Sequence, residues 1–531
     1  MLGPYKDSVF IGNFGRLKPH MIGAQLREID SLRTPDDRRN SGSLRWYIAT
    51  LVFLLIGMTT TTLVARFSIV WVLALLILPL LAIASLSGLR YAAASYGLLR
   101  QRLTVWHGLL LLLFLSGLVF RVRAVDQIQE SAIDAWALYR LGLMGVVALV
   151  LASRLATRKT DGIKSLFRGL IGAMAIYAII CAISTIWSVF PEWTLYKSLE
   201  YLTDIAVIAA IVASVRTIDE YSSLFDWIWV LYGVLLCSVW IGAALAPSLA
   251  FVSNRGVFGF ELEGVIPQVS SNGVGEASAL LGAVAFTRLI LRRHRKGSAS
   301  WYVLLLTLSV VTLLISQARS GWLGFSVGVL LAAFHRNARL AIAGLIVFAL
   351  AAFVFTATTQ VAHTYLLRGQ DPELFHSLSG RLDWWQRAWS AIQERPWFGY
   401  GAYAGGRFVV LTHFGDMSTS SVHNSYVETT LGCGITGLIP FLGALVGAWW
   451  QLARARFKLL ISKLDGQLAV EALSVLGVLT ARSMFSVTMI WHPAVEFLVV
   501  LGYAELLRRG RSEVISATPG GLHLRQGLNV A

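Results

Sequence analysis

Two apolar runs meet at a short polar turn near the middle of the chain. WYVLLLTLSVVTLLIS occupies residues 301–316, GWLGFSVGVLLAAF occupies 321–334, and QARS joins them at 317–320. Each run, with its flanks, is typical of a membrane-spanning helix, which needs about 20 largely apolar residues. Runs of this kind, bounded by charge, recur along the chain. They predict fourteen spans, which start near Trp46, Phe67, Val105, Trp136, Leu170, Leu199, Trp227, Ala277, Trp301, Gly321, Leu340, Ser425, Leu468 and Val495.

The composition agrees with this interpretation. The chain has 531 residues, of which 56% are hydrophobic and 14% charged, and its mean hydropathy is +0.66. A soluble domain has about 25% charged residues, so the composition excludes a soluble globular enzyme. The spans near Ala277 and Val495 are short. The sequence therefore predicts an all-α fold, a polytopic membrane bundle of about 12–14 transmembrane helices.

The distribution of charge predicts the topology. An even number of spans puts both termini on one side, and eight positive charges before Trp46 place that side in the cytoplasm. With this orientation, 31 of the 45 Lys and Arg residues fall in cytoplasmic loops, 11 fall outside, and Arg140, Arg288 and Arg482 fall within spans. The net charge of +16 then reflects topology and indicates no nucleic-acid partner.

The same assignment divides the chain into five parts. These are a basic cytoplasmic tail at 1–45, N-terminal spans at 46–170, a core at 171–450, C-terminal spans at 451–507 and a second cytoplasmic tail at 508–531. The core contains a long outer loop at 361–424. Because long loops usually carry function, this loop is the first place to look for a site.

The long outer loop is predicted to contain a helix. Ser379 is a suitable cap for a helix over 380–395, and Pro396 would end it. Such a helix carries an apolar stripe for the membrane surface or the bundle. The stripe comprises Leu382, Trp385, Trp389 and Ile392.

Arginine dominates the outer positive charges, with Lys197 as the one exception among eleven. Its planar guanidinium binds phosphate oxygens in pairs and stays charged at low dielectric. Interfacial anchoring and ion pairing are the alternative, which we favour for Arg368, Arg387, Arg395 and Arg407 individually. Arg319 differs, because it sits in the turn between two spans. A charge so placed is expected to face a water-filled cavity inside the bundle.

The second candidate is the sequence SVHNS at 421–425, where the long loop meets a span. His423 titrates near neutrality and can accept a proton from an attacking hydroxyl, and Asn424 could cap the helix or orient a substrate. Glu428 follows about one and a half turns later. A simple polar helix start explains the same pattern equally well. His492, beside Pro493, is expected to be structural.

Other polar residues are given structural interpretations. Asp204, Glu276 and Glu496, near span ends, are expected in ion pairs or helix caps. The pattern GxGxxG at 432–437 lies within an apolar run with no preceding strand, so it predicts a kink or close helix packing rather than a dinucleotide site. No set of side chains has metal-binding spacing, and we expect neither a metal nor a cofactor.

Several of these pieces, in this order, resemble the O-antigen ligase and polymerase superfamily of bacterial membrane glycosyltransferases. The resemblance covers about residues 175–448. It rests on IWSVFP at 186–191 with Lys197, Arg255-Gly256 with NGVG at 272–275, QARSG at 317–321, Gly380-Arg381 to Trp389, PWFGYG at 396–401, HNSY at 423–426 and GITGL at 434–438. Residues 261–268 resemble an insertion.

The resemblance implies a metal-independent transfer on the periplasmic face of the bacterial inner membrane. A hydroxyl of an acceptor glycan, or of lipid A-core, would attack a glycan carried on polyprenyl pyrophosphate. His423 and Arg319 would be catalytic, with His423 as the base or orienting group. The remaining implied substrate-binding residues are Arg381, Arg255, Lys197, Asn424 and Trp385, and Trp384, Trp389 and Trp397 would complete an aromatic lid over the sugars.

Three functions stay open at this point. Within the superfamily, a ligase joins a finished O-antigen to lipid A-core, whereas a polymerase joins lipid-linked units to one another, and exopolysaccharide polymerases are a related possibility. A transporter or lipid-glycan flippase is an alternative in which Arg140, Arg319 and Arg482 would line a pathway. A non-catalytic scaffold of a polysaccharide export complex is the third possibility.

Overall fold

The computed structural model shows a helical membrane bundle, which confirms the predicted fold class. It describes residues 103–118, 134–157, 167–215, 217–253, 258–291, 299–336, 377–415, 419–458 and 463–509, with single positions between 338 and 375. All of them belong to one compact unit, Leu80–Ala531. The spans predicted near Trp46 and Phe67, and most of the span near Leu340, lie outside the described residues.

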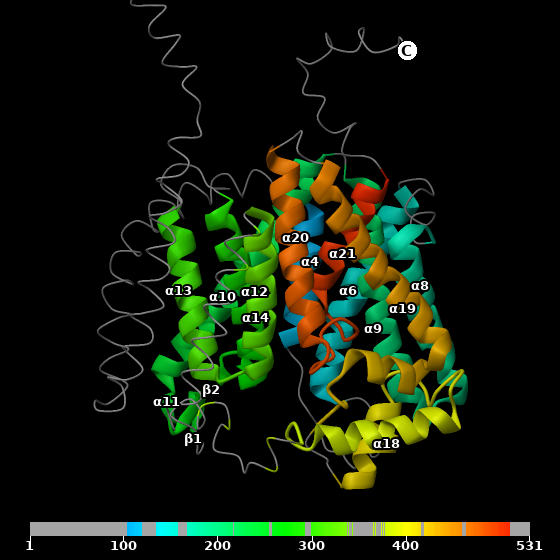
Figure 1. The fold of residues 1–531 in the computed structure, drawn as a ribbon. Coiled ribbons are helices and arrows are strands. Elements are labelled where there is room, and N and C mark those ends of the chain that lie inside the picture. The colour runs from blue at the N-terminus through cyan, green and yellow to red at the C-terminus, as the bar shows by residue number, and fades with distance from the viewer. Residues whose placement is uncertain are drawn as a thin grey trace, which may run out of the picture. The chain divides into compact units, whose positions relative to one another are not determined.

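Six helices in the described ranges are long and apolar enough to cross a membrane. Each corresponds to a predicted span, and further helices complete the bundle (Figure 1). The six belong to α6 (Ala135–Thr157), α8 (Gly169–Ile183), α10 (Ile218–Leu245), α12 (Ser271–Ile290), α13 (Ala299–Ser316) and α19 (Ser425–Lys458). The others are α4 (Val105–Leu118), α9 (Pro191–Ser214), α14 (Arg319–Arg336), α20 (Lys463–Arg482) and α21 (Val495–Arg508).

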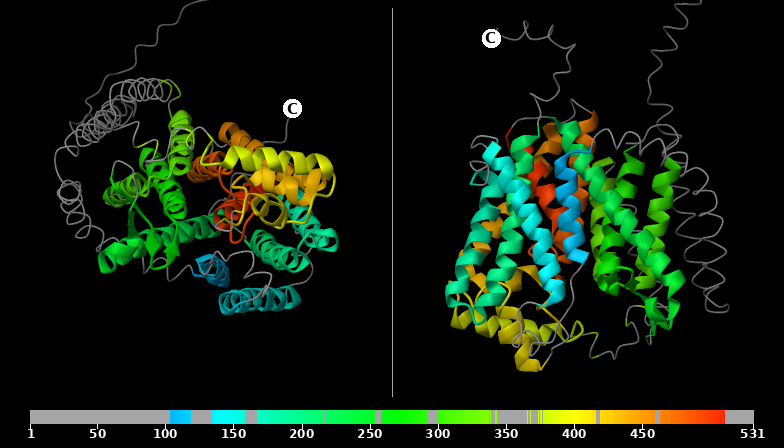
Figure 2. Two further views of the ribbon diagram at one scale, coloured as in Figure 1. Left: turned by 90° about the horizontal axis from the view of Figure 1, so that it is seen from below. Right: turned by 180° about the vertical axis from the view of Figure 1, so that it is seen from behind.

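One end of the bundle is covered by α18 (Arg381–Glu394), which lies across the helix ends (Figures 1 and 2). We call this the α18 end. The turn between α13 and α14 lies there, as do the start of α19 and the segment that joins α20 to α21. Polar residues that are far apart in the sequence therefore meet at this end.

Two spans begin earlier than their apolar runs predict. The first turn of α9 is built by Pro191 and Glu192, which suit a helix start, so Lys197 is helical rather than in a loop. Ser270 accepts a hydrogen bond from the Gly273 amide and starts α12, so residues 272–275 form its first turn. Before α12, two short hairpins follow α11 (Pro247–Ala250). They pair β1 (Phe251–Ser253) with β2 (Phe260–Leu262) and β3 (Gly264–Val265) with β4 (Gln268–Val269).

The helix predicted in the long outer loop is confirmed, and it ends before Pro396 as predicted. The predicted cap is wrong. Gly380 is the cap residue, with φ of +80°, and the Ser377 hydroxyl accepts the Gly380 amide hydrogen bond. Glycine adopts this left-handed conformation without a steric cost. Of the predicted stripe, Ile392 is buried, whereas Leu382 and Trp389 are exposed.

The GxGxxG pattern forms a break in α19, as predicted. Gly434 is non-helical, with φ of +63° and ψ of −163°. The break leaves the carbonyls of Leu431 and Gly432 to accept hydrogen bonds from the amides of Tyr400 and Gly401, both at 2.9 Å. The returning outer loop is therefore bonded to the kinked helix. It continues through η2 (Gly406–Val410) and η3 (Leu411–Phe414).

Replacement of Gly434 by alanine is expected to destabilise the protein by about 2–4 kcal/mol. The added Cβ would lie 2.2 Å from the Trp397 carbonyl group, in a conformation that L residues rarely adopt. Gly443→Ala is the matched control, because it lies in the same helix with nothing within 4 Å of the new Cβ. The thermal unfolding midpoint in detergent should fall for Gly434→Ala only. Equal midpoints would contradict this account of the kink.

Candidate functional site

His423 lies in a strained turn immediately before α19. Its φ is +54°, which is uncommon for a residue with a side chain and indicates a conformation imposed by the surroundings. The next residue, Asn424, caps α19, because its Oδ1 accepts the amides of Tyr426 and Val427 at 2.9 and 3.0 Å. The His423 ring is 6.1 Å from the ring of Trp384 in α18. The helix start thus fixes the position of the histidine backbone.

The buried carboxylate of Glu428 supports the turn that contains His423. Glu428 is 2% exposed, and its Oε2 accepts the Val422 amide at 3.1 Å. It lies against Gly406, where a Cβ atom would be 2.3 Å from the same oxygen. Only glycine leaves room for the carboxylate at that position. Glu428 therefore links the returning outer loop to the turn that holds His423.

Residues 483–494 join α20 to α21 without forming a helix, and we call them the crossover segment. Its first carbonyls receive hydrogen bonds from the site. Asn424 Nδ2 donates to Met484 O at 3.2 Å, and the Ser425 hydroxyl donates to Ser486 O at 3.0 Å. Arg381, at the start of α18, donates from Nη1 to Phe485 O at 3.3 Å. One short stretch of backbone therefore positions residues from two other elements.

Trp385 joins α18 to the same turn. Its Nε1 donates to Val422 O at 2.9 Å, and its ring lies 6.2 Å from that of Phe485. Its helix packs through buried Ala388, Ala391 and Ile392 against a small apolar cluster that includes Val422. These contacts place the start of α18 beside His423.

Arg319 begins α14 at the same end of the bundle. Its Nη2 lies 3.5 Å from the Ser379 hydroxyl, and its guanidinium carbon lies 5.3 Å from the centre of the Phe375 ring, a cation–π distance. Ser379 is two residues before Arg381. The two arginines are thus brought to neighbouring positions, each at a helix start, where the helix dipole also favours an anion.

The turn at 317–321 is held by tight packing and by a buried ion pair. Gly275 of α12 faces Ala318, where a Cβ would be 2.2 Å from the alanine side chain, and Gly321 packs against the Gly275 carbonyl. Arg482 donates to Ser320 Oγ at 3.2 Å and to Glu276 Oε2 at 3.1 Å. Arg482 therefore secures the residue next to Arg319.

Lys197 lies in a second cluster, on α9. It is 3% exposed and 3.0 Å from Glu200 Oε2, and Glu200 also pairs with Arg140 of α6. The Lys197 Nζ and the Arg407 guanidinium lie 5.2 and 5.1 Å from the centre of the Trp193 ring. Arg407 is 1% exposed, so the predicted interfacial anchoring is wrong for this residue, and its predicted ion pairing stays a prediction.

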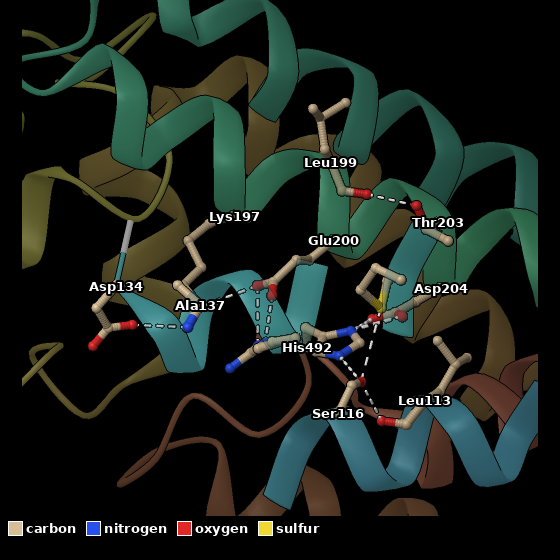
Figure 3. A network of polar contacts seen from close by, with 12 residues as sticks. Leu113, Ser116, Asp134, Ala137, Lys197, Leu199, Glu200, Thr203, Asp204 and His492 are labelled. Atoms are coloured by element: carbon tan, nitrogen blue, oxygen red, sulfur yellow. Dashed lines mark hydrogen bonds and ion pairs between the residues drawn. The ribbon is translucent and has the colours of Figure 1, made fainter. Parts of the chain in front are cut away.

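The crossover segment is also held from this second cluster. The Tyr403 hydroxyl donates to Ile490 O at 3.0 Å. Burial raises the pKa of this hydroxyl well above its ordinary value, so it remains protonated and can donate. His492 bonds Asp204 of α9 at 2.8 Å (Figure 3).

Most of the predicted site residues meet at the α18 end. Asn424, Arg381 and Trp385 each contact the crossover segment. His423 precedes Asn424 and lies 6.1 Å from the Trp384 ring, and Arg319 lies 3.5 Å from Ser379, two residues before Arg381. Lys197 lies in the second cluster, and Arg255 lies outside the described residues. Sequence reasoning missed the crossover segment, for which Pro493 and the polar residues before it are the signal. It also missed the partners of Asp204 and Glu276, which no sequence pattern indicates.

The fold and the site together define a polytopic helical membrane protein with a polar site, containing His423, Arg319 and Arg381, beside α18 at one end of its bundle. Residues 302–442 match the family model described as O-antigen ligase. This match confirms the resemblance over residues 302–442, a segment that is similar to the O-antigen ligase family. The matched segment contains His423, Arg319, Arg381, Asn424 and Trp385. No curated protein matches the chain.

The two functions of Asn424 can be separated by substitution. Asn424→Asp keeps the oxygen that caps α19 but replaces the amide donor to Met484 O by a carboxylate. We expect stability within about 0.5 kcal/mol of wild type and a fall of about tenfold in the activity of the site. Asn424→Ala should lose about 1 kcal/mol of stability as well. Unfolding midpoints and turnover of both variants test this, and full activity of Asn424→Asp would contradict the role given to the Met484 bond.

Proposed function

We propose that the protein transfers a glycan from polyprenyl pyrophosphate to a hydroxyl of an acceptor glycan, without a metal, at the periplasmic face of the inner membrane. The observation that carries the proposal is the placement of His423 in a fixed turn beside Arg381 and Arg319. A general base, two cations and a membrane-facing aromatic helix are the groups that such a transfer needs.

In the proposed step, the acceptor oxygen forms a bond to the anomeric carbon of the donor sugar as the bond from that carbon to the pyrophosphate oxygen breaks. His423 accepts the hydroxyl proton or orients the hydroxyl toward the sugar. The pyrophosphate leaves with the electron pair of the broken bond. Arg319 and Arg381 stabilise its developing negative charge.

The remaining predicted substrate contacts follow from this orientation. Arg255 is expected to reach the same pyrophosphate, and Lys197 remains a predicted contact from its position in the second cluster. Trp389 and Trp397, each 61% exposed, would face the membrane surface and stack on the sugars with Trp384 and Trp385. The donor lipid then enters from the bilayer beside α18.

The orientation rests on charge. The positive-inside pattern supports a topology with both termini in the cytoplasm and the α18 end in the periplasm. A transport pathway is the less favoured alternative. Arg140 and Arg482 are each buried and paired with a glutamate, an arrangement that suits a structural role rather than the lining of a path.

His423→Ala and Arg319→Ala are each expected to reduce transfer from a purified lipid-linked donor by at least about 1,000-fold. Both variants should insert into membranes and fold, because neither side chain is a buried part of the bundle. His413→Ala and Arg395→Ala are matched controls, since both residues are exposed in the outer loop that contains His423. They should stay within about twofold of wild type. Full activity of either site variant would refute the assignment of that residue.

Deletion of the gene should alter one class of surface glycan, and the class identifies the acceptor. Loss of capped lipopolysaccharide indicates a ligase, single repeat units indicate an O-antigen polymerase, and loss of a secreted polymer indicates an exopolysaccharide polymerase. Surface glycans are compared by gel and by mass spectrometry. Complementation with the wild-type gene, but not with His423→Ala, links the change to catalysis. Unchanged glycans would contradict the proposal.

A further inference from the structure

His492 connects the far end of the crossover segment to two helices (Figure 3). Its Nδ1 lies 2.8 Å from both carboxylate oxygens of Asp204 in α9. Its Nε2 lies 2.6 Å from the hydroxyl oxygen of Ser116 in α4. The His492 side chain is 1% exposed, and Asp204 and Ser116 are fully buried. A serine, a histidine and an aspartate thus form one buried chain of hydrogen bonds.

The burial of this chain indicates a structural role. The Ser116 hydroxyl donates to Leu113 O at 2.7 Å within its own helix and also lies 3.8 Å from Met144 Sδ. A nucleophile has to be reached by its substrate, whereas Ser116 and Asp204 are both fully buried. Both ring nitrogens of His492 are thus engaged inside the bundle, and the geometry is that of an anchor with two bonds.

The basic residues near Asp204 pair with Glu200, so His492 is the hydrogen-bond partner of Asp204. Glu200, one turn before Asp204 on α9, is held by Arg140 and by Lys197. These pairs satisfy Glu200 within the second cluster. Because a buried carboxylate without its partner is strongly unfavourable, the bond to Asp204 fixes His492 firmly.

The anchored segment is the one that positions the candidate site. At its far end, Tyr201 donates to Met489 O at 2.7 Å, Tyr403 donates to Ile490 O, and His492 binds Asp204 and Ser116. At its near end, the carbonyls of residues 484–486 accept bonds from Asn424, Arg381 and Ser425. Since the segment is non-helical, these side chains replace the internal bonds of a helix.

We infer that Ser116, His492 and Asp204 form a latch that holds the crossover segment in register with the catalytic site. They are positioning residues and act through the carbonyls of residues 484–486. This role rests on the proposed transferase function. All three residues lie outside the segment 302–442 that matches the family.

The test removes the two arms of the latch one at a time in the full-length protein. His492→Asn keeps a donor for Asp204 and loses Ser116, whereas His492→Gln reaches Ser116 and loses Asp204. Ser116→Ala removes the bond to His492 together with the bond to Leu113 O, with little change in packing, and is the variant expected to fold most readily. Trp229→Phe is the matched control, because it removes a buried hydrogen bond of 2.9 Å to Glu471. Glu471 also pairs with Arg288, which lies near the end of α12 that is remote from the candidate site.

Two measurements are made on folded protein isolated by size exclusion. Amide hydrogen exchange of peptides covering 483–494 should accelerate about tenfold or more in His492→Gln, and less in His492→Asn and Ser116→Ala. Turnover per folded molecule should fall in the same order, by about tenfold in His492→Gln, with acceptor KM within about twofold. Trp229→Phe should change neither the exchange of this segment nor turnover. If the latch bonds were merely structural, the variants would lower the unfolding midpoint without slowing turnover at an unchanged acceptor KM.

The double variant His492→Gln with Asn424→Asp tests whether both act through one segment. Its turnover should lie within about twofold of the slower single variant, because the two defects overlap. Unchanged exchange of 483–494 in the latch variants would overturn the latch. Faster exchange with normal turnover, or independent multiplicative losses in the double variant, would overturn its coupling to the site. If the wild type transfers no glycan, the proposed function fails, while the exchange result still decides whether the latch exists.

Discussion

The structure depends on the pairing of charges that are buried within an apolar bundle. An isolated charge in this environment is very costly, so each arginine within a predicted span has an acidic partner. Arg140 pairs with Glu200, Arg288 with Glu471, and Arg482 with Glu276. The first pair joins α6 to α9. The other two both join α12 to α20, one near each end of α12. Two ion pairs at opposite ends of α12 fix its register on α20, and the α13–α14 turn that carries Arg319 packs against α12 through Gly275.

The same requirement applies to backbone groups and explains the form of the site. Where α19 breaks at Gly434 and where α20 gives way to the crossover segment, carbonyls lose their helical partners. The returning outer loop supplies amides for the first break, and Asn424, Ser425, Arg381, Tyr201 and Tyr403 supply donors for the second. Within a membrane, irregular backbone is tolerated only when it is enclosed by protein or lines a cavity. A polar site and a broken helix therefore occur together, because each supplies partners to the other.

Hydropathy was sufficient to predict the fold class and most described spans, and the helix of the outer loop was predicted from its apolar stripe and from Pro396. It predicted the starts of α9 and α12 too late, because Pro191 and Ser270 begin these helices within polar sequence that hydropathy assigns to loops. His423, Arg381 and Arg319 were chosen from local motifs, and the structure groups them. The buried pairs were beyond sequence reasoning: their partners are 60 to 206 residues apart, and no spacing rule connects them. Arg407 was misjudged for the same reason, since its aromatic neighbour Trp193 lies on a different helix.

Adjacent positions on the 317–321 turn show how a structural ion pair can support a proposed site. Ser320 is held by Arg482, which pairs with Glu276, so this ion pair fixes the start of α14. The neighbouring residue, Arg319, lies beside the Phe375 ring and the Ser379 hydroxyl, at the face where α18 begins. A preorganised cation stabilises a developing negative charge without reorganisation at the moment of reaction. In the proposed transfer, Glu276 and Arg482 thus contribute indirectly, because they hold the backbone that positions Arg319.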